Sequence, residues 1–254
     1  MIGRLVRHDL AARRAEVAEI AELSPRMRRF TLRLAAGSPP VAFERLAVGD
    51  HVKLGFPDPT TGELPLPPEG RPVMRDYSVR AVPDPEHVVV DFVIHGAGPA
   101  TDWAASATVG SAIGVLGPRG SHILPDDRPR YLVLVDESAL PAAARWLEEA
   151  PAGASVEVAI EAPDGDLPTL PRRARASVTH VDGTDGAGLA AQLRSWAPRP
   201  GDLVWAAGET ASMLAVRQTA RALGLDADDV DVHGYWKRGV AGRDHHQPLD
   251  ADAS

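Results

Sequence analysis

The sequence predicts two domains, all-β followed by α/β: an antiparallel six-stranded β-barrel, then a doubly wound α/β domain. Three observations support this prediction. Up to about residue 124, short segments rich in β-branched and aromatic residues alternate with turns rich in proline and glycine, which is typical of antiparallel strands. Further along, apolar segments alternate with helical ones, as in a parallel sheet covered on both faces. Between them, the run LPDDRPR at 124–130 has the composition of a linker.

We therefore expect domains at residues 1–124 and 125–240, and a disordered polar tail at 241–254. A net charge of −8 without a basic, aromatic-interleaved stripe argues against nucleic-acid binding. There is no apolar run long enough for a spanning helix and no apolar block like that of a secretory signal. Because cysteine is absent, the chain has neither a thiol nucleophile nor disulfides. These features lead us to expect a cytoplasmic protein without membrane insertion, and we expect it to be a monomer.

The barrel begins with two extended segments between Ala15 and Leu34. The second, RRFTLRL, alternates in period two and places Phe30, Leu32 and Leu34 on one face. Alanine and glutamate in the first, AEVAEIAEL, also favour a helix. We predict a strand because the segments that follow have strand character and short turns.

Four further strands complete the predicted barrel. They are expected at residues 49–57, in a segment around 75–78, at 87–95 and at 111–121. The run 58–72 is too rich in proline and glycine for regular structure and is expected to be a surface loop.

The second domain is predicted from alternating strands and helices. We expect strands at residues 130–136, 155–162, 176–183, 202–208 and 229–236, and helices at residues 138–150, 188–196 and 211–224. The first of these strands, RYLVLVD, is continuously apolar, as expected for a parallel strand buried on both faces.

One strand of the barrel carries residues suited to a flat, charged ligand. Arg75 and Tyr77 are two positions apart, so a strand places their guanidinium and phenol on one side and Ser78 on the other. The alternative is an ordinary edge strand with a half-buried tyrosine.

The segment HGAGPATDW at 95–103 supports the ligand interpretation. Gly96 and Gly98 permit positive φ, Pro99 suits the first turn of a helix, and the Thr101 hydroxyl is within reach of a phosphate. A plain helix entry, capped by Thr101 or Asp102, is the alternative. Together with the Arg75 strand, the segment predicts a site for a flat, phosphate-bearing aromatic cofactor.

Six motifs in one order resemble those of the siderophore-interacting proteins, a branch of the ferredoxin-reductase-like flavoproteins. They are RDYSVR at 75–80, HGAGPATDWA at 95–104, GPRGS at 117–121, DESALP at 136–141, AGE at 207–209 and YWKRG at 235–239. The resemblance implies an FAD-binding barrel and an NAD(P)H-binding α/β domain. The implied activity passes electrons from NADH or NADPH through FAD to ferric siderophores and releases iron as Fe(II).

The resemblance also implies the site residues. Arg75 would neutralise flavin phosphate, Tyr77 would pack on the isoalloxazine, and Ser78 would hydrogen-bond near its reactive edge. No catalytic side chain and no protein metal ligand is expected. The full cofactor set is Arg75, Asp76, Tyr77, Ser78, Val93, His95, Gly98, Pro99, Ala100, Thr101, Asp136, Glu137, Ser138 and Ala139, with Lys237 and Arg238 as substrate-binding residues.

The second domain departs from the family in one place. Relatives commonly carry a glycine before the Asp-Glu pair, whereas this chain has Val135, and the domain has no Gly-x-Gly-x-x-Gly fingerprint. Glu161 lies at the end of the second strand, where it would accept from ribose hydroxyls and favour NADH, or else be an exposed loop residue. Two other functions stay open: a noncatalytic flavin or siderophore carrier, and a flavin reductase or electron-transfer protein with another acceptor. His245 and His246 lie in the tail and lack a spaced carboxylate partner, so no metal site is expected there.

Overall fold

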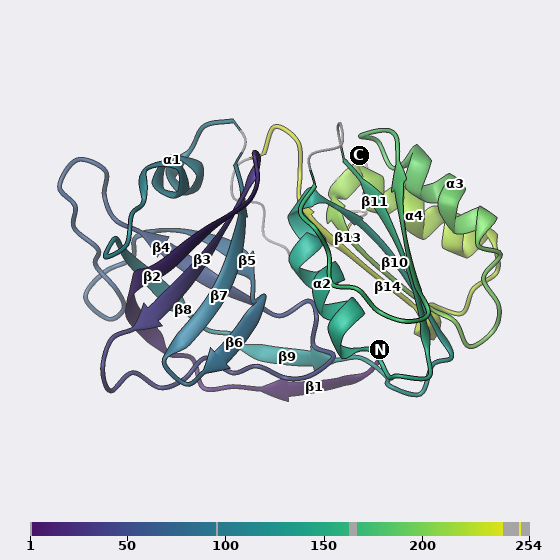
Figure 1. Cartoon of the computed structure of the whole chain (residues 1–254), viewed down its shortest axis with the longest axis horizontal. Coiled ribbons are helices and arrows are strands. Elements are labelled where there is room, and N and C mark those ends of the chain that lie inside the picture. Colours follow the sequence, from purple (N-terminus) through teal and green to yellow (C-terminus); the bar gives the residue numbers. More distant parts are fainter. Residues whose placement is uncertain (1, 95, 163–166, 241–248, 250–254) are drawn as a thin grey trace. The chain divides into compact units, whose positions relative to one another are not determined.

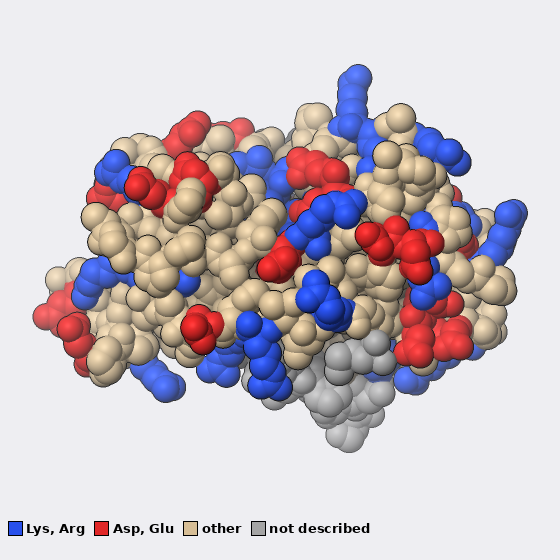
Figure 2. All heavy atoms as spheres, turned by 90° about the horizontal axis from the view of Figure 1, so that it is seen from below, with Lys and Arg blue, Asp and Glu red and all other residues tan. Residues whose placement is uncertain are grey.

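The computed structural model describes residues 2–94, 96–162, 167–240 and 249 (Figure 1). The chain divides into two compact units, one built on Arg4–Ile123 and the other on Leu124 and the residues that follow. Within the part of the chain that the structure describes, no helix has the length and apolarity needed to cross a membrane. Figure 2 shows basic and acidic side chains interspersed over one face of the molecule, so neither sign of charge dominates that face.

The N-terminal unit contains a seven-stranded antiparallel sheet with the order β5-β4-β8-β2-β3-β7-β6. Its strands are β2 Ala12–Ser24, β3 Met27–Leu34, β4 His51–Phe56, β5 Val73–Ser78, β6 Ala81–Asp84, β7 His87–Val93 and β8 Ala112–Leu116. The six predicted strands are all present, and the segment that also favoured a helix is a strand, β2. β5 and β6 are the two end strands of this order, yet only two residues separate them in the chain. The N–H of Arg80, between them, donates to the Val89 carbonyl of β7 at 2.9 Å, so the sheet curls into a barrel.

The prediction missed β6 and a separate two-stranded ribbon. The ribbon pairs β1, Arg4–Arg7, with β9, Gly120–Ile123. Each of these three strands has only four residues, and β1 and β6 are largely exposed. Because they bury no alternating apolar face, the periodicity that identifies longer strands is absent from them.

Alternating apolar residues fill the barrel core, as predicted for RRFTLRL. Phe30 and Leu32 are fully buried and lie opposite Val90 and Val88 of β7. The helix α1, Pro99–Ser106, packs on this core through Trp103. The helix that follows the glycines of the predicted cofactor motif is therefore attached to the barrel core.

The C-terminal unit is a five-stranded parallel sheet with the order β12-β11-β10-β13-β14. Its strands are β10 Arg130–Asp136, β11 Ser155–Glu161, β12 Ala176–Val181, β13 Leu203–Glu209 and β14 Val230–Trp236. The helices are α2 Leu140–Glu149, α3 Ala187–Ser195 and α4 Thr210–Ala222, with short 3₁₀ turns η1 at Glu137–Ala139 and η2 at Ala227–Asp229. Every strand and helix predicted for this domain is confirmed.

Helices cover both faces of this sheet (Figure 1). On one face, Leu132 and Leu134 of β10 pack with residues of α3 and α4. On the other, the Tyr131 ring packs on Trp146 of α2 with centroids 4.8 Å apart. The strand order reverses between β10 and β13, and the carboxyl edge at such a reversal is where doubly wound sheets bind ligands.

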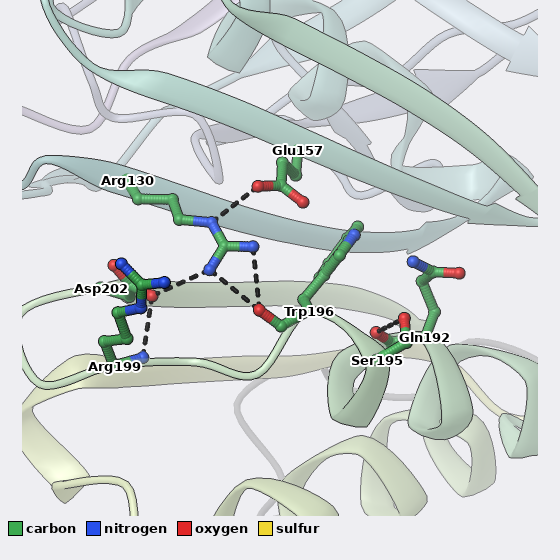
Figure 3. A network of polar contacts seen from close by, with 7 residues as sticks. All are labelled: Arg130, Glu157, Gln192, Ser195, Trp196, Arg199 and Asp202. Atoms are coloured by element: carbon green, nitrogen blue, oxygen red, sulfur yellow. Dashed lines mark hydrogen bonds and ion pairs between the residues drawn. The ribbon is translucent and has the colours of Figure 1, made fainter.

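At the opposite, amino edge, a polar network centred on Arg130 ties three strands to a helix (Figure 3). The Arg130 guanidinium donates to Glu157 of β11 at 2.7 Å and to Asp202, just before β13, at 3.2 Å. It also donates to the Trp196 carbonyl at the end of α3, at 3.0 and 3.1 Å. Since Arg130 is the first residue of β10, the network joins the central strand to both of its neighbours.

Replacing Arg130 by alanine should lower the free energy of unfolding by about 1.5–3 kcal/mol, the usual worth of hydrogen bonds to charged groups. Glu157 and the buried Asp202 would lose a partner. Urea unfolding followed by tryptophan fluorescence measures this loss. The matched control is Arg199→Ala, because the exposed Arg199 enters the network through its backbone N–H and carbonyl, and it should change stability by less than about 0.5 kcal/mol. Equal losses in the two variants would contradict the role assigned to the Arg130 guanidinium.

Candidate functional site

Arg75 and Tyr77 lie on β5, two residues apart and hence on the same face of the strand. The Tyr77 ring packs against Phe92, with centroids 4.0 Å apart, and more loosely against Phe56. Burial raises the pKa of the Tyr77 phenol, while the charge of Arg75 acts in the opposite direction. The phenol therefore stays protonated beside a cation, in a pair that can receive a flat, anionic ligand.

The other predicted residues of this strand have different surroundings. Ser78 is buried, and the Asp76 carboxylate accepts from Lys53 Nζ of β4 at 2.7 and 3.0 Å. That carboxylate is thus neutralised within the sheet. Val93 is the last residue of β7 and pairs with Met27 of β3.

The start of α1 is open on the side that a ligand would approach. Gly96 and Gly98 have φ values of 60° and 143°, and a Cβ added to either would meet nothing within 4 Å. Gly98 is the N-cap residue, so no side chain caps the first turn, and Pro99 occupies its first positions. Ala100 and Thr101 follow in that turn, whereas His95 lies outside the described residues.

This geometry fits a phosphate-bearing cofactor. A helix N-terminus carries partial positive charge and N–H groups that lack intrahelical partners. Glycines at the entry let the ligand approach the backbone closely, because they have no Cβ and adopt positive φ without strain. The open start of α1 and the Arg75–Tyr77 pair thus belong to the same barrel.

In the C-terminal unit, three motifs that are far apart in the sequence meet on one carboxylate. Asp136, at the end of β10, accepts from Ser138 N at 2.8 Å and from Ser138 Oγ at 2.6 Å. It also accepts from Glu209 N at 2.8 Å and from Trp236 Nε1 at 2.7 Å. Burial raises the pKa of Asp136, and these four hydrogen bonds act in the opposite direction. We call Asp136, Ser138, Glu209 and Trp236 the Asp136 hub.

Gly208 explains why glycine stands in the AGE motif. Its φ is 156°, and an added Cβ would lie 2.6 Å from the Asp136 Cγ, closer than real Cβ contacts. A side chain at this position would displace the buried carboxylate. Gly208 is therefore required for the Asp136 hub to form.

Two further carboxylates occupy the same edge of the sheet. Glu209 accepts from Ala211 N and Ser212 N in the first turn of α4, and from Arg238 N at 3.1 Å. Glu161, at the end of β11, accepts from Gly186 N and from Ser212 Oγ. Burial raises the pKa of Glu161, opposed by these hydrogen bonds. The start of α4, which could otherwise bind an anion, is thus capped by the chain's own acids.

The surroundings of Glu161 correct both interpretations made from the sequence. The residue is 4% exposed and its carboxylate is engaged with internal donors. It is therefore neither an exposed loop residue nor a free acceptor for ribose hydroxyls. The preference for NADH that rested on it loses its structural basis.

Val135 is fully buried within β10, opposite Ile160 of β11 and Ala207 of β13. Its side chain contributes to the packing of the sheet. The turn that would face a ligand begins only at Asp136, followed by Glu137, Ser138 and Ala139 in η1. Of these, Ala139 is buried and Ser138 is bound to Asp136.

The two predicted substrate-binding residues follow β14. Arg238 is exposed and its guanidinium donates to the Thr184 carbonyl at 3.2 Å. Lys237 is half-buried and forms an isolated bridge with Val240. Sequence reasoning named both but missed Gly208, Glu209 and Trp236 as parts of the Asp136 hub. Their motifs were visible, but nothing local indicated that they share one acceptor.

A Ser, a His and an Asp also meet in the N-terminal unit, but not as a nucleophilic triad. Ser121 Oγ donates to Asp50 and lies 2.8 Å from His8 Nε2. Ser121 is fully buried, and it bonds the carboxylate directly instead of through the histidine. Among the residues that the structure describes, no group of three potential metal ligands is found.

Comparison with known proteins gives two matches to family models that together cover most of the chain. Residues 16–122 match a siderophore-interacting FAD-binding domain, and residues 128–239 match a siderophore-interacting protein. The boundary between the two matches falls at the change from the antiparallel to the parallel sheet.

Individual relatives agree with these matches. The NADPH-dependent ferric-chelate reductase of Escherichia coli is 36% identical over 152 residues, which are 56% of this chain and 59% of that protein. The ferric vibriobactin reductase of Vibrio cholerae is 29% identical over 244 residues, 89% of each chain. A siderophore utilization protein from T. fusca superposes with a TM-score of 0.82 at 35% identity, covering 96% of this chain and 99% of that one.

Proposed function

The chain belongs to the siderophore-interacting protein family, and on this premise we propose that it is an FAD-dependent reductase of ferric siderophores supplied with electrons by NAD(P)H. The observation that carries the proposal is the open start of α1 with Arg75 and Tyr77 on the same barrel, inside the segment that matches the FAD-binding domain. We assign FAD to the barrel of residues 1–124 and the nicotinamide donor to residues 125–240.

The residues of the barrel would hold FAD by charge and by shape. The first turn of α1, from Pro99 to Thr101, would receive the pyrophosphate, and Arg75 would supply a full positive charge to it. Tyr77 would offer a flat surface to the ring system, held in place by its packing on Phe92. Bound FAD accepts two electrons as a hydride and releases them singly, as reduction of ferric iron requires.

The chain's own task is then to bind the cofactor and the substrates, to orient them and to exclude water, because the redox chemistry belongs to the cofactor. The ferric siderophore arrives as substrate with its iron already chelated by oxygen donors, so no protein ligand for iron is needed. Such hard donors hold the ferrous ion more weakly than the ferric one, and reduction therefore releases the metal to other ligands.

We propose that the nicotinamide donor binds at the carboxyl edge of β10 and β13, where the strand order reverses. The starts of η1 and α4 are already occupied by Asp136 and Glu209. Two carboxylates at these N–H groups disfavour a pyrophosphate in the usual position of a dinucleotide-binding fold. The donor is therefore expected to bind through side chains around this edge, in agreement with the absence of a glycine-rich fingerprint.

The experiment that tests the function is spectroscopic. Purified full-length protein should bind added FAD, and NADH or NADPH should bleach the flavin absorbance band under anaerobic conditions. Adding the ferric complex of a catecholate or a hydroxamate siderophore should then restore the band and yield Fe(II), detected with a ferrous chelator.

Three other outcomes would indicate a different function. Failure of the wild-type chain to bind FAD would overturn the proposal. FAD binding without bleaching by either nucleotide would indicate a carrier, and reduction of free riboflavin without release of Fe(II) would indicate a flavin reductase. We also propose that the protein works as a monomer in the cytoplasm, which size-exclusion chromatography and cell fractionation test.

Lys237 is proposed to attract the anionic ferric chelate. Lys237→Ala should raise the KM for an anionic ferric siderophore about tenfold, because a local positive charge raises the encounter rate with anions. The KM for the nicotinamide donor should stay within about twofold. Steady-state kinetics with each substrate varied in turn measure both values.

The matched control for Lys237 is Arg221→Ala. Arg221 is an exposed cation in the last turn of α4, and α4 returns from the carboxyl edge to the amino edge of the same sheet. This variant should change neither KM. Equal increases of both KM values in Lys237→Ala would mean that the lysine has a structural role instead.

A further inference from the structure

The helix α1 is too short to keep its own position. It has eight residues, Pro99–Ser106, whereas isolated helices of fewer than about 12 residues are marginal in water. Its placement must therefore come from contacts with the barrel. Because its first turn is the proposed phosphate cradle, those contacts also decide where the cradle points.

One contact fixes the middle of the helix. The indole of Trp103 packs on Phe30, Phe56 and Phe92, with ring centroids 5.2, 5.8 and 5.6 Å apart. Its Nε1 donates to the Ala112 carbonyl at 3.2 Å, and the neighbouring Ala104 is fully buried. Ala100 and the buried Ala107 pack on the same core, so one face of the helix is held against the barrel.

The second contact fixes the C-terminal end. Arg28 of β3 donates through Nη1 to the carbonyls of Ala104 and Ala105, the latter at 3.3 Å. The last turn of α1 contains no basic residue of its own, so the guanidinium supplies a cation at the negative end of the helix dipole. It also satisfies carbonyl groups that have no intrahelical partner.

Arg28 also contacts the neighbouring strand and an aromatic ring of the barrel core. Its Nε donates to Glu22 of β2 at 2.7 Å, and its guanidinium lies over the Phe30 ring, 5.4 Å from the centroid. The side chain is 19% exposed. Through Arg28, the position of the last turn of α1 therefore depends on the position of the β2–β3 pair.

We propose that Arg28 is a positioning residue for the pyrophosphate of FAD. It contacts the C-terminal end of α1, and with Trp103 it sets the direction in which the N–H groups at the opposite end point, about 8 Å away along the helix. The inference rests on the proposed function, because it assumes that FAD occupies the start of α1. It adds a residue outside every family motif to the set that determines cofactor affinity.

The test compares two ligands that share the isoalloxazine but differ in phosphate. Flavin-free full-length protein is titrated with FAD and with riboflavin, and each dissociation constant is measured from fluorescence. Arg28→Ala should raise the Kd for FAD about tenfold, or about 1.4 kcal/mol, and leave the Kd for riboflavin within about twofold. Arg28→Lys keeps the cation at the negative end of the helix dipole but loses the planar fork of donors, so it should recover part of the FAD affinity.

Arg29→Ala is the matched control. Arg29 is the next residue of β3, so its side chain points to the opposite face of the sheet from that of Arg28, and it pairs with Asp91 of β7 at 2.7 and 2.8 Å. Its loss should lower stability but keep the ratio of the two dissociation constants. If Arg28→Ala does not fold, Arg28→Gln takes its place, since it keeps part of the aliphatic stem and an amide donor but removes the charge.

The outcomes separate this inference from the function on which it rests. A wild-type chain that does not bind FAD overturns the proposed function itself. Suppose that wild-type protein binds FAD. If Arg28→Ala then weakens the binding of FAD and of riboflavin equally, or weakens the binding of neither, the positioning role of Arg28 is overturned while the function stands. A selective loss of FAD affinity, partly rescued by lysine, supports it.

Discussion

Replacing Asp136 by alanine is expected to lower the free energy of unfolding of the C-terminal unit by about 2–4 kcal/mol. The carboxylate accepts four hydrogen bonds, and two of the donors, Glu209 N and Trp236 Nε1, come from other strands. Each buried donor left without an acceptor costs about 1–3 kcal/mol. Part of this loss is offset because the variant no longer buries the charge of the Asp136 carboxylate.

Urea unfolding followed by intrinsic fluorescence measures this effect. The signal reports mainly on the C-terminal unit, because it contains four of the five tryptophans, namely Trp146, Trp196, Trp205 and Trp236. Trp236→Phe removes one donor alone and should cost about 1 kcal/mol. In the double variant the two losses should not add, because the same hydrogen bond is removed twice.

Asp182→Ala is the control for the Asp136 variant. Asp182 is an exposed acid just after β12, so its removal takes away the same charge without a buried acceptor. It should change stability by less than about 0.5 kcal/mol. If Asp136→Ala were equally mild, the four contacts would not stabilise the fold, and the Asp136 hub would have to be explained by ligand binding instead.

Replacing Arg75 by alanine is expected to weaken FAD binding by about 1.5–3 kcal/mol, the worth of a charge-assisted contact with phosphate. This corresponds to a Kd roughly 10- to 150-fold higher. The purified variant should lose its yellow colour on dialysis, and titration with FAD should give the new Kd. Since Arg75 and Tyr77 share a face of β5, the lost charge also changes the surroundings of the phenol.

Two variants make the Arg75 result specific. Arg71→Ala removes the same charge from an exposed position in the loop before β5 and should keep FAD affinity within about twofold. Arg75→Lys keeps the charge but loses the planar fork of donors, so an intermediate affinity is expected. Unchanged flavin occupancy in Arg75→Ala would remove Arg75 from the site.

The Asp136 hub changes how the family motifs of the C-terminal unit are understood. DESALP, AGE and YWKRG are separate in the sequence, yet Asp136, Glu209 and Trp236 form one hydrogen-bonded group at the reversal of strand order. Gly208 is needed because the carboxylate occupies the space of its missing side chain. These residues assemble the carboxyl edge of the sheet, where we propose that the nicotinamide donor binds.

The sequence by itself determined most of the secondary structure. Continuous apolar runs such as RYLVLVD and the alternation in RRFTLRL specify which face of each strand is buried, and both strands formed as predicted. The glycines and the proline before Thr101 likewise predicted the start of α1. These features depend on neighbouring residues, so local patterns are sufficient to find them.

Only the tertiary structure decided the roles of several side chains. Trp236 bonds to Asp136 across 100 positions of sequence, and Arg28 reaches Ala104 across 76. Glu161 follows a strand as an exposed or ligand-binding acid would, but its carboxylate turns to Gly186 and Ser212. The physical reason is the same in each case: a buried polar group must find a partner, and which partner lies within hydrogen-bond distance is set by the packing of distant segments.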